Sequence, residues 1–523
     1  MKNWASGYIT DLTYTHGFYR ELTPHILTFS LLTRNRDAKN ASGLRPAGLR
    51  PAYCELGCGQ GFSTNLLAAA NPDIDFYGVD FNPAHIVGSN RLAEEAGMKN
   101  VHFFDDSFAQ FNARTDLPQF DIIALHGVYG WIAKEHRETI VRFIDQRLKP
   151  GGIVYISYNC LPGWAGPGPL RQLICFASDA TTGTSAQRVD AGFALIERMQ
   201  AARAQYFSSV PSLAKRVEKL KEQDRAYLAH EFMNDSWTAF YHADVAQDMA
   251  AARLSYVGSA RLLEHIDIIN MTAEQQAILD ETIDPAVRET LRDYMTNEQF
   301  RRDIFVRGPI PLTPNEAREI WLDSHFVLTT PREEVGDKVT GALGEATLHA
   351  DVYSPLLDAF THADTGEGGK AMSLRQIFAN APAVAELEWA RVHEAITLLV
   401  GANHLQPCPA TEEENGQRHE SAKRFNRAVM ARARHSSDLQ CLASPVTGGG
   451  IGVGRIQQLF LLALAENDED PARFVWRILE AQDQRLVKDG RVLDGEEENV
   501  AELNESHTAF QKRIPLLRNL GII

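Results

Sequence analysis

The stretch Tyr53-Cys-Glu-Leu-Gly-Cys-Gly-Gln-Gly61, followed by Tyr77-Gly-Val-Asp80, decides the fold of this chain. The pattern predicts a short strand, a glycine turn, the start of a helix, and then a second strand that ends in an acid. Gly57, Gly59 and Gly61 would let the backbone lie close to a nucleoside ligand, where a side chain would collide with it. Asp80 follows at a spacing of roughly 20 residues, where a doubly wound sheet places the carboxylate that binds ribose hydroxyls.

The residues on either side of this motif extend the same pattern. Residues 53–176 alternate between strand-like and helix-like segments, which predicts an α/β fold with a doubly wound, mostly parallel sheet. Helices are expected to begin near Ser63, Pro83 and Glu135. The expected strands are 53–56, 76–80, 101–104, 120–126 and 153–158.

With 523 residues, the chain is too long for one hydrophobic core. Helical apolar spacing dominates from about residue 185, and the order of elements in 335–410 resembles a winged helix. The polar stretch 411–440 is expected to be a linker or an exposed helix. The expected units are an aromatic and helical lid segment at 1–52, the sheet domain at 53–180, a helical domain at 181–310, a winged-helix-like unit at 335–410 and a C-terminal helical region at 411–523.

The composition and residue spacing of the chain argue against several classes of function. The formal net charge of −16 argues against unspecific binding to nucleic acid or to an anionic membrane, since both need a basic face. The six cysteines form no CxxC pair, so free thiols in a reducing compartment are expected. No run of about 18 apolar residues is present, which predicts a cytoplasmic protein without membrane insertion. The histidines show neither HExxH nor Cys/His clustering, so no metal site is expected.

Glu55, which precedes the first glycine, makes the motif resemble the first motif of class I S-adenosylmethionine (SAM) methyltransferases. Three further stretches, 11–24, 126–131 and 155–164, resemble bacterial methyltransferases that carry a methyltransferase regulatory domain. Some members of that family are rickettsial protein-lysine methyltransferases of outer-membrane proteins. Here His16 and Thr23 replace the usual Ser and His of the rickettsial enzymes, a departure that concerns the acceptor rather than the cofactor.

The resemblance implies SAM as the cofactor and assigns residues to it. Asp80 would bind the ribose, Phe81 would cover the adenine edge, and Asp106 would accept from the adenine amine, with Asp105 as an equally spaced rival. The complete set expected at the cofactor is Glu55, Gly57, Gly59, Gly61, Asp80, Phe81, Asp106, Ser107, His126 and Gly127. The residues expected at the transferred methyl group and the acceptor are Tyr129, Trp131, Tyr158, Asn159 and Tyr14.

The resemblance also implies a protein acceptor, with a lysine ε-amine as the methylated group. Two alternatives stay open on the sequence. One is a methyltransferase for a small molecule or a saccharide, which a dedicated base at His126 or His16 would favour. The other is a SAM-liganded regulatory protein that uses its helical and winged-helix-like parts to contact a partner.

Overall fold

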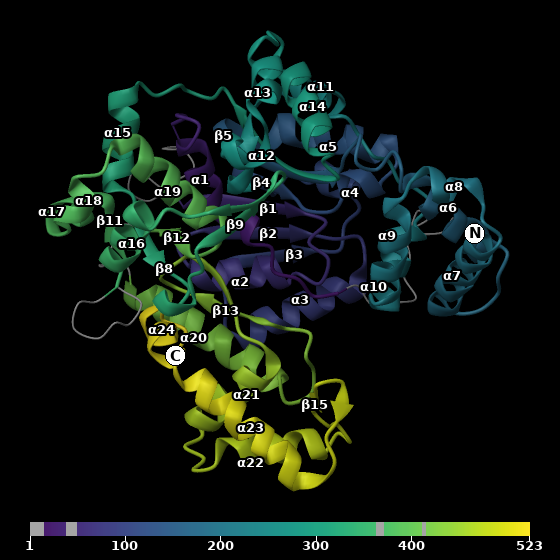
Figure 1. Cartoon of the computed structure of the whole chain (residues 1–523), viewed down its shortest axis with the longest axis vertical. Coiled ribbons are helices and arrows are strands. Elements are labelled where there is room, and N and C mark those ends of the chain that lie inside the picture. The colour runs from purple at the N-terminus through teal and green to yellow at the C-terminus, as the bar shows by residue number, and fades with distance from the viewer. Residues whose placement is uncertain (1–14, 38–49, 362–370, 410–414) are drawn as a thin grey trace.

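A seven-stranded sheet forms the centre of the computed structural model, which describes residues 15–37, 50–361, 371–409 and 415–523 (Figure 1). The strand order is β3-β2-β1-β4-β5-β7-β6, with β1 to β5 parallel and β7 antiparallel to both of its neighbours. Five parallel strands confirm the doubly wound α/β prediction. The strands are β1 (Ala52–Leu56), β2 (Asp75–Val79), β3 (Val101–Phe104), β4 (Phe120–Leu125), β5 (Leu148–Asn159), β6 (Leu254–Ser259) and β7 (Phe300–Arg307).

Alternating side chains of the strands build two separate cores on the two faces of the sheet. Tyr53 of β1 points to the face that α1 and α2 cover, whereas its neighbour Cys54 points to the face that α4, α5 and α11 cover. Helix α3 packs beside α2. The helices are α1 (Pro24–Leu32), α2 (Phe62–Ala70), α3 (Pro83–Glu95), α4 (Phe108–Ala113), α5 (Lys134–Arg147) and α11 (His242–Ala250).

The sheet continues beyond the expected domain boundary at residue 180. Residues 254–259 and 300–307 were expected within a helical domain, yet they form β6 and β7, the last two strands. Helix α14 (Pro285–Thr296) ends at Asn297, which adopts a left-handed conformation, and β7 follows it. Strand β7 could not be predicted from its sequence, because two of its buried positions hold the charged residues Arg301 and Asp303 and the alternation of apolar and polar residues is lost.

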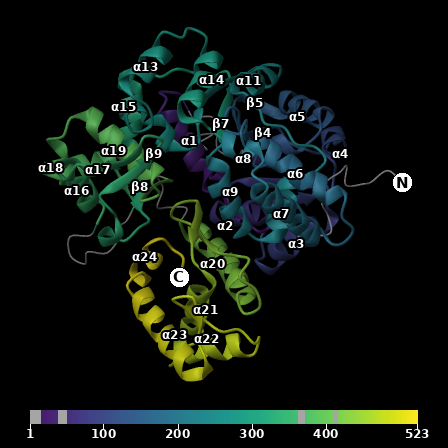
Figure 2. The ribbon, with the colours of Figure 1, turned by 45° about the vertical axis from the view of Figure 1, so that its right-hand side comes forward.

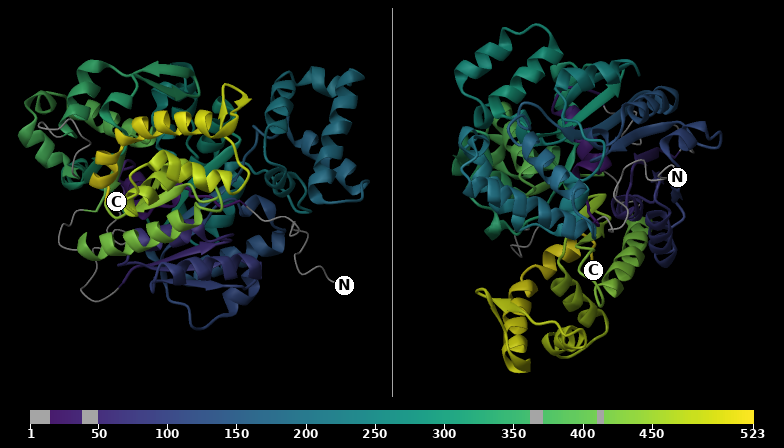
Figure 3. Two further views of the ribbon diagram at one scale, coloured as in Figure 1. Left: turned by 90° about the horizontal axis from the view of Figure 1, so that it is seen from below. Right: turned by 90° about the vertical axis from the view of Figure 1, so that its right-hand side faces the viewer.

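A helical insertion follows β5 and stands to one side of the sheet (Figure 3). Its own core contains Trp164, Phe193, Leu213 and Phe232. The insertion agrees with the helical character expected after residue 185. Its helices are α6 (Gly168–Asp179), α7 (Ser185–Ala201), α8 (Gln205–Ser209), α9 (Ser212–Lys221) and α10 (Arg225–Phe232).

Residues 314–408 form a small α/β unit beside α1, around a core that includes Trp321, Phe326 and Leu399. Helices surround a three-stranded sheet of order β11-β8-β12 in this unit. The winged-helix identity of this unit stays a prediction. Its main elements are α15 (Pro314–Asp323), β8 (His325–Leu328), β9 (Lys338–Gly341), β10 (Gly344–Thr347), α16 (Ala350–Ala359), β11 (Met372–Ser373), α17 (Leu374–Asn380), α18 (Pro382–Ala385), α19 (Trp389–Gly401) and β12 (Leu405–Cys408). Between β6 and this unit lie α12 (Asp267–Asn270), α13 (Ala273–Asp280) and α14.

The C-terminal unit packs directly on α2 and α3, which cover the central sheet (Figure 2). Most of the polar stretch 411–440 is neither a linker nor an exposed helix, because one face of α20 (Asn415–Arg432) is buried: Phe425 has no exposed surface and its ring contacts Phe62 of α2. Ala422, Phe425 and Val429 recur at helical spacing among charged residues, which conceals this face in the composition. The remaining elements are β13 (Cys441–Ser444), β14 (Gly449–Gly452), α21 (Arg455–Ala465), α22 (Pro471–Glu480), β15 (Val487–Lys488), β16 (Arg491–Val492), α23 (Gly495–Gln511) and α24 (Ile514–Asn519).

The six cysteines are all free, as the sequence predicts. Within the described ranges, every helix is too short or too polar to cross a lipid bilayer.

Candidate active site

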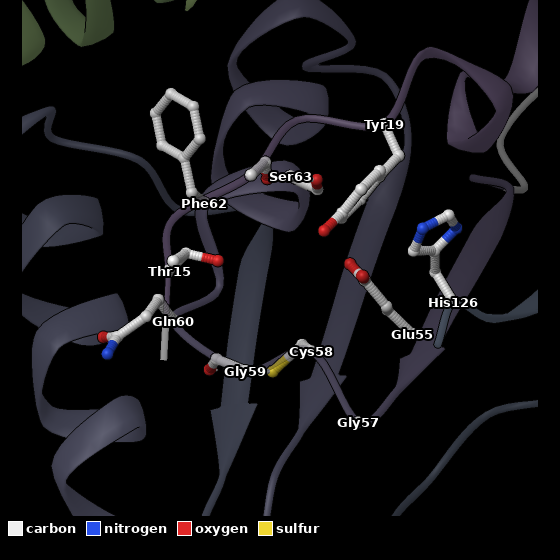
Figure 4. A pocket seen from close by; sticks show the side chains of 11 residues that line it. Thr15, Tyr19, Glu55, Gly57, Cys58, Gly59, Gln60, Phe62, Ser63 and His126 are labelled. Carbon is white, nitrogen blue, oxygen red and sulfur yellow. Dashed lines mark hydrogen bonds between the residues drawn. The ribbon is translucent and has the colours of Figure 1, made fainter. Parts of the chain in front are cut away.

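A polar pocket opens at the carboxyl ends of β1 and β4, where ligands bind in open α/β sheets (Figure 4). Figure 4 shows Tyr19, Glu55 and His126 pointing into the same space. Four of the residues expected at the cofactor lie here: Glu55, Gly57, Gly59 and His126. The lining residues are Thr15, Gly17, Tyr19, Glu55, Gly57, Cys58, Gly59, Gln60, Phe62, Ser63 and His126.

The glycine turn is held to the end of β2 by Asp80. One carboxylate oxygen of Asp80 accepts from the Gly59 N–H at 3.0 Å, and the other accepts from the Asn82 N–H at 2.9 Å and lies 3.2 Å from His85 Nδ1. Gly57, Gly59 and Gly61 all have positive φ, and a Cβ atom at Gly57 would lie 2.5 Å from a Val128 methyl. The three glycines are therefore required by the backbone conformation, and Gly57 also by its close approach to Val128.

Glu55 is buried at the end of β1, with 4% of its surface exposed. Burial raises the pKa of its carboxyl to about 7, and a hydrogen bond from the Thr64 hydroxyl opposes that rise. A carboxyl of this kind gains most from a cationic ligand group, because the positive charge restores its ionised form. The cationic amino group of a methionine-like ligand matches this requirement.

His126 lies under the ring of Tyr19, and the two centroids are 3.6 Å apart. Its Nδ1 lies 2.8 Å from the Tyr155 hydroxyl, and burial lowers the pKa of His126 to about 3. The imidazole is therefore neutral at physiological pH, so it does not repel a cationic ligand, and it is too weak a base to take a proton from an acceptor.

The other residues expected at the cofactor are not among those that line the pocket. Phe81 is half-buried directly after Asp80. Asp106 pairs with Arg114 at 3.1 Å, whereas Asp105 is exposed, and the Ser107 side chain caps α4. The Gly127 N–H donates to the Ser157 hydroxyl at 2.8 Å. Their contacts with adenine and the methionyl group stay predictions.

Tyr129 occupies the core instead of the pocket. It has no exposed surface, and its hydroxyl donates to Asp248 at 2.7 Å. Trp131, two residues later in a short 3-10 turn, is half-buried. Tyr14 lies outside the described residues. Of the aromatic residues expected around the methyl group, Tyr129 has the surroundings of a packing residue, because the loop after β4 folds back onto α11.

Tyr158 belongs to a buried ionic network beneath the end of β5. Its hydroxyl donates to Asp303 at 2.5 Å, and Asp303 also accepts from Arg301 and pairs with His242. Asn159, the next residue, is 3% exposed, and its amide nitrogen has no hydrogen-bond partner among the described residues. The Tyr158 hydroxyl is therefore already hydrogen-bonded within the protein, whereas the amide nitrogen of Asn159 could still form a hydrogen bond with a ligand.

Several contacts at the site give no signal in the linear sequence. Thr64 and His85, which hold Glu55 and Asp80, lie on helices that follow the two motifs. The turn Asp80-Phe-Asn-Pro83, with Asn82 as helix cap and Pro83 in the first turn, is the one pattern that could have placed His85 one turn along α3. Within the described ranges, no group of three or more His, Cys, Asp or Glu side chains is placed to hold a metal ion.

Comparisons with known proteins agree with this geometry. Residues 54–154 match the family described as a methyltransferase domain, and residues 224–307 match the family described as a predicted methyltransferase regulatory domain. An uncharacterized protein of Synechocystis sp. is 40% identical over 522 residues, which covers 99% of each chain. The chain belongs to the bacterial class I SAM-dependent methyltransferases that carry a regulatory domain.

Solved structures extend the likeness of this methyltransferase to its whole fold. PKMT2 from Rickettsia typhi superposes with a TM-score of 0.67 at 17% identity, covering 96% of this chain and 99% of that one. The same protein in complex with AdoHcy (S-adenosylhomocysteine) gives a TM-score of 0.67 at 18% identity, covering 97% and 100%. A second sequence relative, an uncharacterized protein of Rickettsia prowazekii, is 26% identical over 269 residues, 50% of this chain and 47% of its own length.

The cofactor of the methyltransferase is SAM, and the pocket fits it chemically. A buried carboxyl at Glu55 suits the amino cation, a neutral His126 tolerates the sulfonium charge, and the glycine turn gives close access to the backbone. When bound, SAM supplies an electrophilic methyl group.

Proposed function

We propose that this methyltransferase transfers the methyl group of SAM to a protein acceptor, with a lysine ε-amine as the nucleophile. Glu55, the turn Gly57–Gly61, Asp80, and the loop His126–Gly127 would hold the cofactor, and Phe81 with Asp106 would flank its adenine. The work of the protein is then to position the amine lone pair in line with the methyl carbon. We place this activity in the cytoplasm, where the free cysteines stay reduced.

The observation that carries the choice of an amine is the state of His126. Transfer to an oxygen acceptor needs a base that takes the hydroxyl proton during the reaction. With a pKa of about 3 and its Nδ1 close to the Tyr155 hydroxyl, His126 does not meet that need. His16, the other candidate base, also has a lowered pKa through burial. An amine that has already lost its proton needs no such base.

Asn159 is the residue that we propose to orient the amine. Its side-chain amide is buried and keeps hydrogen-bonding capacity at the end of β5. A half-turn of the amide exchanges its nitrogen for its oxygen, so it can accept from an incoming amine. Trp131 in the neighbouring loop would supply an aromatic face to the cationic methyl group.

A large acceptor is supported by the units that surround the sheet. The α6–α10 insertion, the 314–408 unit and the C-terminal unit are all additions to the catalytic sheet. The net charge of −16 favours a cationic, lysine-bearing surface on the acceptor.

The test is to incubate the purified chain with methyl-labelled SAM and a cell lysate separated into macromolecules and small molecules. We expect label in protein, recovered as methyl-lysine after acid hydrolysis, and markedly less label with the Asp80→Ala variant when SAM is limiting. Label confined to small molecules would contradict the protein acceptor and favour a small-molecule or saccharide methyltransferase. AdoHcy binding without label in either fraction would favour a SAM-liganded regulatory protein.

A further inference from the structure

The glycine-rich stretch 447–452 of the C-terminal unit lies against the N-terminal segment that lines the pocket. Strand β14 pairs with β13 and packs on α2. A Cβ atom at Gly450 would lie 2.8 Å from a Phe18 ring carbon and 3.0 Å from a Leu66 methyl. At Gly449 a Cβ atom would lie 3.0 Å from the Thr23 hydroxyl. The space that side chains at Gly449 and Gly450 would occupy is therefore filled by Thr23, Phe18 and Leu66.

Phe18 joins two hydrophobic cores. It packs against the core of the C-terminal unit and also against the core between the sheet and helices α1 and α2. The two residues beside Phe18 both line the pocket: the Gly17 carbonyl accepts from the Ser63 hydroxyl at 2.9 Å, and Tyr19 stacks on His126. The position of the Phe18 ring thus sets the course of the backbone at the mouth of the pocket.

Residues 15–19 have no regular secondary structure, so side-chain contacts must hold them. A segment without a helical or sheet ladder loses conformational entropy when it orders over a ligand. If the Phe18 ring is already packed in place before the ligand binds, less conformational entropy is lost on binding.

We propose that Phe18 is a positioning residue for cofactor binding, and that Gly450 of the C-terminal unit forms its socket. Through this contact the C-terminal unit raises the affinity for SAM without lining the pocket itself. The inference rests on the assignment of SAM to the pocket beside Gly59, and it is independent of the acceptor.

The test compares two glycines of the same strand by calorimetric titration of the full chain with AdoHcy. Gly450→Ala places a methyl group against the Phe18 ring, whereas a Cβ atom at Gly452 meets nothing within 4 Å. We expect Gly450→Ala to weaken AdoHcy binding by about tenfold, as overpacking displaces the ring. Gly452→Ala is the matched control and should bind like the unchanged chain.

Two Phe18 variants separate positioning from general damage. Phe18→Ala should weaken AdoHcy binding by about tenfold and raise the KM for SAM, with a smaller change in kcat. Adding Phe18→Leu to Gly450→Ala should recover part of the lost affinity, because a smaller side chain makes room for the new methyl group. If Gly450→Ala lowers the melting temperature too far for titration, Phe18→Ala alone decides.

Equal AdoHcy affinities of Gly450→Ala and Gly452→Ala in folded protein, or unchanged affinity of Phe18→Ala, would overturn the inference. Asp80→Ala serves as the reference for the pocket itself. If Asp80→Ala binds weakly and Phe18→Ala normally, only the role of Phe18 fails. If both bind normally, the assignment of the pocket fails.

Discussion

Tyr19 lies nearly flat on His126, with ring centroids 3.6 Å apart and planes inclined by 25°. The pair joins the N-terminal segment to the loop after β4 at the pocket, and Nδ1 of the imidazole lies 2.8 Å from the Tyr155 hydroxyl. Since burial keeps His126 neutral, the stack is a contact between two uncharged rings.

Replacing Tyr19 should therefore affect cofactor affinity through the ring and hardly through the hydroxyl. We expect Tyr19→Ala to cost ~0.5–1.5 kcal/mol of AdoHcy binding, the range for an aromatic pair, and Tyr19→Phe to stay within ~0.5 kcal/mol of the unchanged chain. Calorimetric titration measures both. A larger loss in Tyr19→Phe than in Tyr19→Ala would mean that the hydroxyl, not the stack, matters.

Asp80 is expected to be the strongest single determinant of cofactor affinity. Its carboxylate already orders the glycine turn through the Gly59 N–H, and it is the proposed partner of the ribose. We expect Asp80→Ala to weaken AdoHcy binding by ~1.5–3 kcal/mol, the range for a hydrogen bond to a charged group. Asp75→Ala, which removes an exposed ion pair with Arg50 at the other end of β2, is the control and should change the affinity little.

Cofactor affinity should rise with pH because of Glu55. Its pKa is raised from 4.5 to about 7, so the carboxyl is largely protonated below neutrality and can then offer no charge to the ligand amine. We expect AdoHcy binding to be about tenfold weaker at pH 6 than at its high-pH plateau, since one unit below a pKa about a tenth of the group is ionised. Glu55→Gln should remove this pH dependence, and a slope that persists in Glu55→Gln would assign it to another group.

The same residue acts on stability with the opposite sign. Between 4.5 and about 7 the folded chain keeps the Glu55 proton that the unfolded chain releases. The contribution of Glu55 to the free energy of unfolding is therefore largest below 4.5 and falls as pH rises through this window. Denaturant titrations of the ligand-free chain at several pH values, compared with Glu55→Gln, measure this fall.

Tyr158 should prove to be a stability residue. Its hydroxyl donates to Asp303, and Arg301 and His242 also contact that carboxylate, so Tyr158→Phe leaves Asp303 partly satisfied. We expect Tyr158→Phe to lower the free energy of unfolding by ~1 kcal/mol and to leave the KM for SAM unchanged. Tyr294→Phe, which removes an exposed hydroxyl contact with Tyr241, is the control for the denaturant titration. A normal unfolding free energy together with a large loss of kcat would return Tyr158 to the acceptor site.

The conformation of the motif around Gly57 and Asp80 is determined by residues close in sequence, so it could be predicted from the sequence. Positive φ at Gly57, Gly59 and Gly61 and the helix start after Gly61 depend on neighbours within a few residues. The resemblance of stretch 126–131 to a known family pointed to the loop after β4, where His126 lines the pocket, but it did not indicate which side chains of the loop face the ligand. Tyr129 and Tyr158 could not be assigned in this way, because their burial depends on Asp248 and Asp303, more than 100 residues away in the chain.

By itself, the sequence determined the parallel sheet, the glycine turn and the places of the carboxylates Glu55 and Asp80 at the ends of two strands, since these depend on short-range spacing and backbone conformation. The cofactor class came from the resemblance of the motifs to a known family. Only the tertiary structure decided that residues 254–259 and 300–307 complete the sheet, that α20 packs on α2, and that the Phe18 ring packs against Gly450 of β14. Contacts of this second kind join segments that are far apart in the chain, as Phe18 and Gly450 are. They are stabilised by the joint burial of apolar surfaces, which no local pattern of residues encodes.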